Sequence, residues 1–516
     1  MFQLQPIEIK NKKWIQFFIF VFILRFLFSF YIPLIDDEAY HWSWTRHLSF
    51  SYFDHPGMIA WLEWLSTTLL GDTYFGVRLP AFLCYTFAFY FLWRLTYEFF
   101  QNENAAHAVG VLFLFTPFWG FGGFVAAPEP PYLLSWILAT YVFWQGVRED
   151  QFQWSLKKTW ITLGFIMGFG INSKFIIVLL PLGFLLFLIL TPRHRRDLLT
   201  PWPWLGLIIA SILSAPIFIW NIQNEWPTFK FQFHDRHADT SGFDPARWFT
   251  FWGAQFVFLT PFLYLFVMFT WGYAATQIKK TPWRILFCFC LPSFFVFYPQ
   301  PLWADYKPHW SGTAYTLLIM GSCYLWVQGI QIKNRTFLKP YSRLLAGSVL
   351  VFIVPINLFL YSPFLGPVLP TVYNWFKTDK SWNPQWDLSN EFYGWEELGL
   401  HVNKRQLEIL ANTGELPFLA AHRYETTAQT YWGTRQRVFM LSKTRSHYTV
   451  MQTQEEMQNL VGKNALFVVS EKYPIDPMRF AQFDSCQAEI LKTYRGRQHS
   501  RTFTIYECKN FQKILR

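Results

Sequence analysis

The sequence predicts a polytopic α-helical membrane protein that ends in an outward-facing α/β domain. Of its 516 residues, 52% are hydrophobic, 22% are aromatic and only 15% are charged. The apolar residues come in runs about as long as the hydrocarbon core of a bilayer is thick. Beyond residue 366 these long runs stop, and short apolar segments alternate with polar turns, as is typical of a domain folded in water.

We expect about eleven transmembrane helices, because polar breaks separate that many apolar runs. Their predicted bounds are 14–34, 77–99, 106–124, 131–147, 159–172, 175–191, 203–221, 248–274, 285–300, 311–329 and 344–362. The first run is too long for a signal peptide and lacks a small-residue cleavage site, so we expect it to be retained.

Basic residues orient these helices. With the N-terminus inside, the N-terminal tail and the even-numbered connections are rich in Lys and Arg, for example in 193–196 and 279–284. The opposite loops are much poorer in them, as the positive-inside rule requires. The formal charge of +11 therefore needs no nucleic acid partner, because anionic membrane lipids would hold these residues. An odd number of helices places the last segment outside, which predicts a transmembrane domain at 1–365 and a periplasmic domain at 366–516.

The last segment predicts a helix followed by a small sheet. The helix is expected at 395–412, and about four strands are expected at 417–421, 438–441, 465–470 and 502–508. Cys486 and Cys508 are the only cysteines of this segment, and an oxidising compartment would allow them to form a bridge. The sequence leaves open whether their strands are adjacent. The other four cysteines lie in predicted helices and are expected to be apolar packing residues.

Unusual polar residues gather on the predicted outer side. Each has an ordinary structural explanation, such as a helix cap for Glu129 or an anchor at the membrane surface for Lys174. Their occurrence on one side favours a functional site instead. They are Asp36, Asp37, Glu38, His41, Asp54 and His55 in the first loop, then Glu129, Lys174, the 234–237 run His-Asp-Arg-His, Lys307 and His309.

These residue types suit the transfer of a group from a phosphate. Carboxylates can orient or deprotonate a hydroxyl, His and Asp can bind a divalent cation, and Lys and Arg can bind a phosphate. The chain has no glycine-rich phosphate loop and no nucleotide fingerprint, so no nucleotide cofactor is expected. A site outside the membrane favours a donor that the membrane delivers, namely a polyprenyl-phosphate-linked sugar.

Several motifs resemble one family over nearly the whole chain. The segments 37–42 (DEAYHW), 52–61 (YFDHPGMIAW) and 76–80 (GVRLP) resemble the first outer loop of the bacterial dolichyl-phosphate-mannose-protein mannosyltransferase-like family, which is related to the lipid A aminoarabinose transferases. Similar matches occur at 172–175 (NSKF), 307–310 (KPHW), 394–398 (GWEEL) and 421–424 (AHRY).

The resemblance implies a C-type glycosyltransferase fold and an inverting enzyme. It implies that Asp37 is the leading catalytic carboxylate, that Glu38 is its partner and that Glu129 is the second acidic position. Lys174 would lie near the donor phosphate, and Asp54 with His234 would hold a divalent cation. The aminoarabinose branch usually has a lysine where this chain has His55.

The remaining polar candidates complete the expected site. We expect contacts with the donor phosphate from His55, Arg236 and Lys307 in addition to Lys174. Contacts with the acceptor or the sugar are expected from Tyr40, His309 and Trp310.

The favoured function is sugar transfer at the outer face of a bacterial inner membrane. Lipid A or core lipopolysaccharide is the preferred acceptor, and a protein hydroxyl is left open. The alternative is a lipid or sugar transporter without transferase activity. Transporters usually place their sites near the bilayer midplane, where Arg25 and Arg94 are the charges to consider.

Overall fold

The fold is known from a computed structural model that describes residues 7, 9–233, 242–329, 331–332, 335–336, 369–375, 382–442 and 446–515. Its internal contacts divide the chain into two units. Unit 1 comprises Met1–Ser29, His55–Leu62 and Arg78–Asn357, and unit 2 comprises Phe30–Asp54, Glu63–Val77 and Leu358–Arg516. The predicted boundary at 365 lies outside the described residues, and parts of the first outer loop group with the C-terminal segment.

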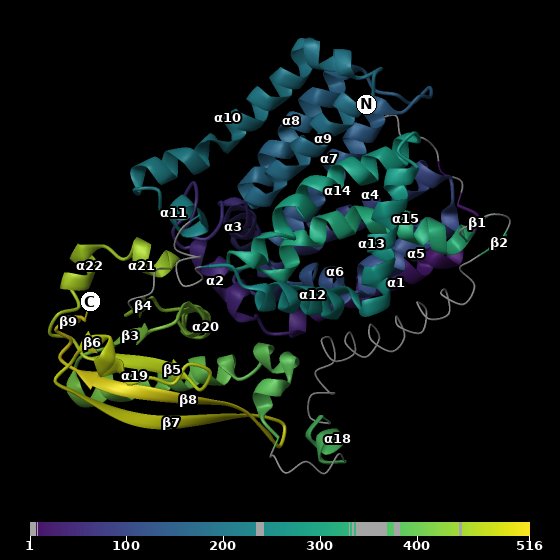
Figure 1. Cartoon of the computed structure of the whole chain (residues 1–516). Coiled ribbons are helices and arrows are strands. Elements are labelled where there is room, and N and C mark those ends of the chain that lie inside the picture. Colours follow the sequence, from purple (N-terminus) through teal and green to yellow (C-terminus); the bar gives the residue numbers. More distant parts are fainter. Residues whose placement is uncertain are drawn as a thin grey trace. The chain divides into compact units, whose positions relative to one another are not determined.

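Unit 1 is helical (Figure 1). Its longer helices are α1 (Lys12–Tyr31), α4 (Tyr74–Phe100), α5 (Glu103–Phe115), α7 (Glu129–Val147), α8 (Leu156–Ser173), α9 (Leu179–Leu190), α10 (Pro201–Gln223), α12 (Pro245–Leu259), α13 (Pro261–Thr276), α14 (Thr281–Phe297) and α15 (Gly312–Gln328). Shorter pieces are α6 (Pro117–Gly122), η1 (Phe175–Val178), η2 (Arg195–Leu199), α11 (Pro227–Phe233), η4 (Gln300–Leu302) and η5 (Pro308–Ser311). A two-stranded hairpin, β1 (Gln331–Ile332) with β2 (Arg335–Thr336), follows α15.

Most predicted helices of this unit overlap observed ones, but the single helix expected at 106–124 was wrong. The structure has α5 and α6 there, separated by Thr116, whose backbone is extended before Pro117. Among the described helices, four are long and apolar enough to cross a membrane, and a bent pair brings the number to five. These apolar helices make the chain a multi-pass membrane protein. The predicted helix at 344–362 lies outside the described residues, so the total of eleven stays a prediction.

The single helix expected at 248–274 was wrong. The structure has two helices there, α12 and α13, and they are bent by 104°. Pro261 lacks an N–H group, and its ring disfavours the helical conformation for the residue before it. Thr260 accordingly has φ 67° and ψ 146°, which breaks the helix at this point.

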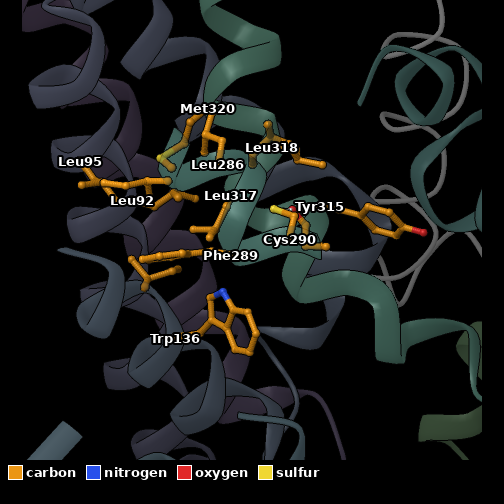
Figure 2. Packing of buried hydrophobic residues seen from close by; sticks show 14 of the residues in the cluster. Leu92, Leu95, Trp136, Leu286, Phe289, Cys290, Tyr315, Leu317, Leu318 and Met320 are labelled. Atoms are coloured by element: carbon orange, nitrogen blue, oxygen red, sulfur yellow. Dashed lines mark hydrogen bonds between the residues drawn. The ribbon is translucent and has the colours of Figure 1, made fainter. Parts of the chain in front are cut away.

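Large apolar side chains form the core of unit 1. Leu92 and Leu95 of α4 and Trp136 of α7 gather with residues of α14 and α15 (Figure 2). The last group comprises Leu286, Phe289, Cys290, Leu317 and Met320. Cys288, Cys290 and Cys323 are buried free thiols, as is Cys84, which confirms their prediction as packing residues.

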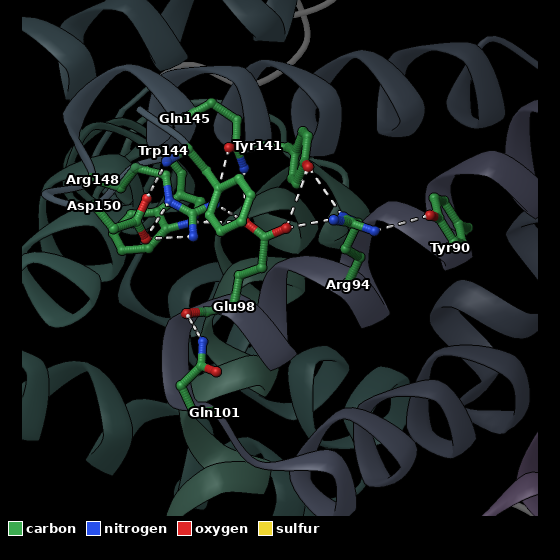
Figure 3. Close-up of polar contacts among 10 residues, drawn as sticks. Tyr90, Arg94, Glu98, Gln101, Tyr141, Trp144, Gln145, Arg148 and Asp150 are labelled. Atoms are coloured by element: carbon green, nitrogen blue, oxygen red, sulfur yellow. Dashed lines mark hydrogen bonds and ion pairs between the residues drawn. The ribbon is translucent and has the colours of Figure 1, made fainter. Parts of the chain in front are cut away.

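A buried carboxylate at the end of α4 organises a polar network (Figure 3). Glu98 is fully buried. Its oxygens accept hydrogen bonds from Arg94 (2.9 Å), Tyr141 (3.3 Å), Trp144 (3.0 Å), Gln145 (2.7 Å) and Arg148 (2.9 Å). Arg94, considered above as a charge for transport, is therefore part of a paired structural network. Arg25 is bound to the carbonyl oxygens of Leu114 (3.0 Å) and Gly120 (2.7 Å).

Unit 2 contains the α/β fold that the sequence predicts, with one strand more than expected. Its five-stranded sheet has the order β4-β3-β5-β8-β7. The strands are β3 (Phe418–Ala421), β4 (Val438–Met440), β5 (Ala465–Ser470), β7 (Ser485–Arg495) and β8 (Gln498–Lys509). β3 is parallel to β4 and β5, whereas β5, β8 and β7 are antiparallel. All six residues of β5 are buried, as expected for a central strand.

Helices cover this sheet and complete unit 2. Trp395, Leu398 and Val402 of α19 (Trp395–Thr413) form one apolar cluster with inward residues of the sheet, so α19 covers one face (Figure 1). The other elements are α18 (Leu369–Trp375), η8 (Pro384–Trp386), η9 (Leu388–Phe392), α20 (Tyr424–Thr434), α21 (His447–Met451), α22 (Gln454–Gln458), η10 (Pro477–Arg479), β6 (Ala481–Gln482) and β9 (Lys513–Ile514).

The first outer loop supplies α2 (Asp36–Trp44) to this unit. Trp42 of α2 packs edge-on against Tyr431 and Trp432 of α20, with ring centroids 5.2 and 4.8 Å apart. Its indole also donates to Asp72 at 2.8 Å. The loop also forms α3 (Met58–Leu70). Neither α2 nor α3 was predicted, because each is shorter than a membrane-spanning run.

A disulfide joins Cys486 to Cys508. The two residues are directly opposite each other on the antiparallel strands β7 and β8, with Cα atoms 4.1 Å apart. The strand adjacency that the sequence left open therefore permits the bridge.

Candidate active site

The acidic run of the first loop forms the start of α2. The carboxylate of Glu38 accepts a hydrogen bond from the N–H of Ile35 (3.1 Å), and Asp36 accepts one from the N–H of Asp37 (3.0 Å). Negative side chains are favourable in the first turn of a helix, where N–H groups point outward unpaired. Glu38 is fully buried, whereas Asp37 is exposed. Asp37 is thus the residue of this run that solvent or a substrate can reach.

Asp36 lies in a crowded group of charges. Burial raises the pKa of its carboxyl to about 6, and the carboxylate of Glu391 adds to this effect, while Lys472 opposes it. Glu425 is a further negative neighbour that raises the pKa. Asp36 can therefore exchange a proton near neutral pH, which the sequence alone did not indicate.

Asp37 and Asp54 each receive a hydrogen bond from a tyrosine. Tyr424 of α20 donates to Asp37 Oδ1 at 3.3 Å, and Tyr40 of α2 makes a short hydrogen bond to Asp54 Oδ2. Tyr40 is buried, and its oxygen accepts from the N–H of His447 at 3.1 Å. The expected contact of Tyr40 with acceptor or sugar stays a prediction.

Glu63 is a buried acid that sequence reasoning missed. It lies in α3, is fully buried, and neither of its oxygens has a hydrogen-bond partner in the described part of the chain. Burial, together with the nearby carboxylate of Glu38, raises its pKa well above the usual value. A single acid inside the apolar run 58–70 was the signal that could have identified it.

In unit 1, Glu129 and Lys174 form an ion pair with a short hydrogen bond. Pro128, Pro130 and Pro131 surround Glu129 at the start of α7, where proline costs no backbone hydrogen bond. Lys174 follows the end of α8 in extended conformation. The helix ends there because side chains such as Asn172, which donates to Gly168 O and Leu213 O at 2.8 Å, compete for backbone carbonyls.

Histidines extend this ion pair. His309 Nε2 is 3.8 Å from Glu129 Oε1, and His55 is close enough to influence the same carboxylate. Burial would raise the pKa of Glu129, but Lys174, His309 and His55 outweigh it and hold the pKa well below its usual value. Glu129 is therefore charged at every physiological pH, although the side chain remains 38% exposed.

A large apolar cavity lies beside this cluster. It has a volume of about 840 Å³ and is lined mostly by apolar residues of α8, α9, α10 and α14, including Ile171, Leu179, Phe218 and Phe297. Lys174, His55 and Trp310 also line it. An elongated apolar molecule with an anionic end would match this combination of an apolar wall and a buried cation.

Among the described residues, Lys307 is a further predicted phosphate contact. Lys307 is exposed and precedes η5. His234 and Arg236 lie outside the described residues, so the predicted metal pair of Asp54 and His234 stays a prediction. Within the described ranges, no group of three or more His, Cys, Asp or Glu is arranged to hold a metal ion.

Comparisons with known proteins agree with the motifs. A sequence model of the dolichyl-phosphate-mannose-protein mannosyltransferase family matches residues 54–220, a range that includes His55, Glu129 and Lys174. The family resemblance predicted from the sequence is confirmed. The matched range also includes Asp54, but it excludes α2 and the C-terminal segment.

Two curated relatives extend this result. The lipid A galacturonosyltransferase RgtD of Rhizobium johnstonii is 22% identical over 308 residues, which cover 57% of this chain and 62% of RgtD. The undecaprenyl phosphate-alpha-4-amino-4-deoxy-L-arabinose arabinosyl transferase of an Enterobacter species is 26% identical over 181 residues, or 35% of this chain and 32% of the relative. The chain thus spans less than two thirds of the length of these relatives.

Solved structures show the fold. ArnT from Cupriavidus metallidurans in the apo state aligns with a TM-score of 0.63 at 13% identity, covering 96% of this chain and 98% of ArnT. The same protein bound to undecaprenyl phosphate aligns over the same shares with a TM-score of 0.64 at 12% identity. The predicted C-type glycosyltransferase fold with a C-terminal α/β domain is confirmed.

Proposed function

We propose that this chain is an inverting glycosyltransferase that moves a sugar from a polyprenyl phosphate to a cell-envelope acceptor. Lipid A or core lipopolysaccharide is the favoured acceptor, and a protein hydroxyl is the third candidate. The observation that carries this proposal is the apolar cavity of about 840 Å³ with the cation of Lys174 in its wall. A polyprenyl chain would fill the apolar part, and its phosphate would contact the lysine.

The relatives support the same chemistry. The name of RgtD identifies lipid A as the acceptor of that protein, and the name of the Enterobacter relative identifies an undecaprenyl-phosphate-linked aminoarabinose as its donor. One of the ArnT structures holds undecaprenyl phosphate. We infer a donor and an acceptor of these classes for this chain, without a choice of sugar.

Lys174 has the leading role in unit 1. An ammonium group has three N–H donors, and one of them binds Glu129. The other two can bind phosphate oxygens, whose negative charge grows as the bond to the sugar breaks, so the cation stabilises the transition state more than the ground state. Glu129 keeps the lysine oriented, and His55, which lines the same cavity, would add a further donor.

In unit 2, the carboxylates of α2 would act on the acceptor. Asp37 is exposed at the start of the helix and would accept the proton of an attacking hydroxyl. Glu38 is buried and bonded to the N–H of Ile35, which suits a supporting role. An acceptor phosphate needs no base, and Asp37 would then only orient it.

We retain the proposal that a divalent cation binds near the donor phosphate. Asp54 is the described member of the predicted ligand pair, and Tyr40 already donates to it. A bound cation would neutralise phosphate charge. The roles of Lys174 and Asp37 given above do not depend on one.

We also propose that the protein lies in a bacterial inner membrane with residues 366–516 in the periplasm. The disulfide between Cys486 and Cys508 supports this location, because such bonds persist in oxidising compartments. A phosphatase fused after the C-terminus should be active, and one fused after Arg196 should be inactive. The reverse result would place the acids of α2 in the cytoplasm and overturn the proposed orientation.

The activity can be tested with the purified protein in lipid nanodiscs. A synthetic undecaprenyl-phosphate sugar and lipid A are supplied, and mass spectrometry measures the modified acceptor and the released undecaprenyl phosphate. We expect both products in equal amounts, and the Asp37→Asn variant serves as the inactive control. The proposal would be overturned if none of the acceptors is modified with donors of several sugars. The acceptors to test are lipid A, core oligosaccharide and a protein.

The broken helix at Thr260 favours a second candidate, a lipid or sugar transporter, because transporters often contain discontinuous helices. The same protein in sealed vesicles with labelled donor lipid separates the two functions. Movement of the label across the bilayer without sugar transfer would support the transporter.

A further inference from the structure

Two tyrosine hydroxyls of unit 2 bind acidic residues of the first outer loop. Tyr424, the first residue of α20, donates to Asp37 Oδ1 at 3.3 Å. Tyr40 of α2 donates to Asp54 Oδ2. The two tyrosine rings lie side by side, with centroids 4.9 Å apart, so the two hydrogen bonds belong to one local cluster.

A backbone group fixes the direction of the Tyr40 hydroxyl. Its oxygen accepts a hydrogen bond from the N–H of His447 at 3.1 Å. A hydroxyl that accepts on one side turns its single hydrogen to the other side, here toward Asp54. His447 is buried at the start of α21, so the C-terminal segment sets the orientation of this hydroxyl.

The position of Tyr424 is set by the packing of α20 on the first loop. Gln429 of α20 donates to the carbonyl of Leu34 at 2.8 Å, immediately before α2. Trp42 packs on the other end of α20, as described above. These contacts fix the start of α20, and with it the Tyr424 hydroxyl, beside Asp37.

We propose that Tyr424 and Tyr40 are positioning residues that hold the carboxylates of Asp37 and Asp54 for sugar transfer. The inference rests on the proposed function, and it makes the C-terminal segment a part of the reaction machinery. Asp37 is exposed, and the Tyr424 hydroxyl binds its Oδ1 from a position that the packing of α20 fixes. A fixed donor favours one orientation of the carboxylate, namely the one that meets the acceptor. The role of Tyr40 differs from the sugar contact that the sequence predicts.

The surrounding charges keep Tyr424 a hydrogen-bond donor. Burial raises the pKa of its hydroxyl far above the usual value, and the carboxylates of Asp37, Glu425, Asp36 and Asp54 add to this effect. The Tyr424 hydroxyl therefore remains a hydrogen-bond donor to Asp37.

The test compares Tyr424→Phe and Tyr40→Phe with Tyr448→Phe in the nanodisc assay. Tyr448 is a matched control, because its buried hydroxyl donates to Ser43 at 2.8 Å and not to an acid. We expect kcat to fall about tenfold in each of the first two variants, with KM for the donor lipid unchanged. Because a donor favours the charged carboxylate, the acidic limb of the kcat profile should move to higher pH in Tyr424→Phe, which removes the donor to Asp37. Tyr448→Phe should retain the wild-type kcat and pH profile.

Two outcomes would overturn the inference. The first is that Tyr424→Phe and Tyr40→Phe keep the kcat and pH profile of Tyr448→Phe while Asp37→Asn is inactive. An active Asp37→Asn would instead refute the role of Asp37 in the proposed function, which is a separate result. If Tyr424→Phe does not fold, 3-fluorotyrosine at position 424 keeps the ring and alters only the donor, and an unchanged pH profile would then be the second contrary outcome.

Discussion

Two carboxylates of unit 1 have contrasting surroundings. Glu98 is fully buried and accepts hydrogen bonds from five side chains, two of them arginines (Figure 3). Glu129 retains 38% of its side-chain exposure and is paired with Lys174, which lines the apolar cavity. Both are ion pairs, but among the described residues the Lys174 ammonium donates a hydrogen bond only to Glu129, which leaves two of its three N–H groups for a ligand.

The number of hydrogen-bond partners of each carboxylate distinguishes structural from functional charges in this fold. The network of Glu98 is complete, so its charges stabilise the packing of α4 against α7. In the pair of Glu129 and Lys174, the lysine is buried but the carboxylate is 38% exposed, and such a charged pair beside a cavity is a candidate for ligand binding. We therefore expect mutations at Glu98 to reduce stability and mutations at Lys174 to reduce turnover.

The largest effect is expected for Glu98→Ala. Without the carboxylate, Arg94 and Arg148 remain buried with reduced compensation, which should lower the free energy of unfolding by about 3–5 kcal/mol. Thermal unfolding of the purified protein in detergent measures the change. The fraction that remains folded should turn over at the wild-type rate, and a slow but fully stable variant would break the distinction between the two pairs.

The second effect concerns Lys174→Met. Removing the cation should lower kcat about 10²–10³-fold, which corresponds to about 3–4 kcal/mol of transition-state stabilisation. Lys174→Arg should retain part of the activity, because the charge survives while the point-charge geometry changes. Turnover of a synthetic polyprenyl-phosphate sugar measures both, with melting temperature as the control. An active Lys174→Met enzyme would show that the lysine is only an anchor at the membrane surface.

The smallest effect concerns Asp36, a carboxylate whose neighbours are mostly negative. Its pKa in the folded protein is about 6, against an ordinary value of 3.8, so the folded state binds the proton more tightly than the unfolded state. The protonated carboxyl is therefore compatible with the fold at pH 4. Stability is lost as the pH rises from about 4 to 6, because the buried group then becomes charged. Asp36→Asn keeps the acceptor for Asp37 N–H and should raise the melting temperature at pH 8 but leave it unchanged at pH 4.

The pKa of Glu129 is shifted in the opposite direction to that of Asp36, so its effect on stability should have the opposite dependence on pH. Its pKa is lowered in the folded protein, so its charge stabilises the fold above the ordinary pKa, and this contribution is lost as the pH falls. Glu129→Gln should therefore lower the melting temperature at pH 7. Equal and pH-independent shifts in Asp36→Asn and Glu129→Gln would contradict both assignments.

The sequence predicted helices well where polar residues interrupt the apolar runs. The predicted end at 172 lies one residue from the observed end of α8, and the predicted start at 175 coincides with η1, because Asn, Ser and Lys interrupt the run there. The break at Thr260 was missed, because hydropathy alone passes over a single proline. The short helices α2 and α3 were missed because each is shorter than a membrane-spanning run.

The candidate site was predicted as a set of residue types without its pairings. The outer acids and Lys174 were recognised from their motifs. The pairing of Lys174 with Glu129 joins residues 45 positions apart, and no local pattern encodes such a contact. Glu63 was overlooked although it is the single acid in the apolar run 58–70, because that run is too short for a membrane-spanning helix and was assigned to no predicted element.

The sequence by itself determined the membrane class, the family resemblance and the α/β character of the C-terminal segment. These properties depend on local hydropathy, strand-length apolar runs and short motifs, all of which are continuous in the chain. Only the tertiary structure decided that Tyr424 meets Asp37 across 387 residues and that Cys486 faces Cys508 on adjacent strands. The physical reason is that such contacts depend on strand register and helix packing, which are set by the burial of side chains from distant segments.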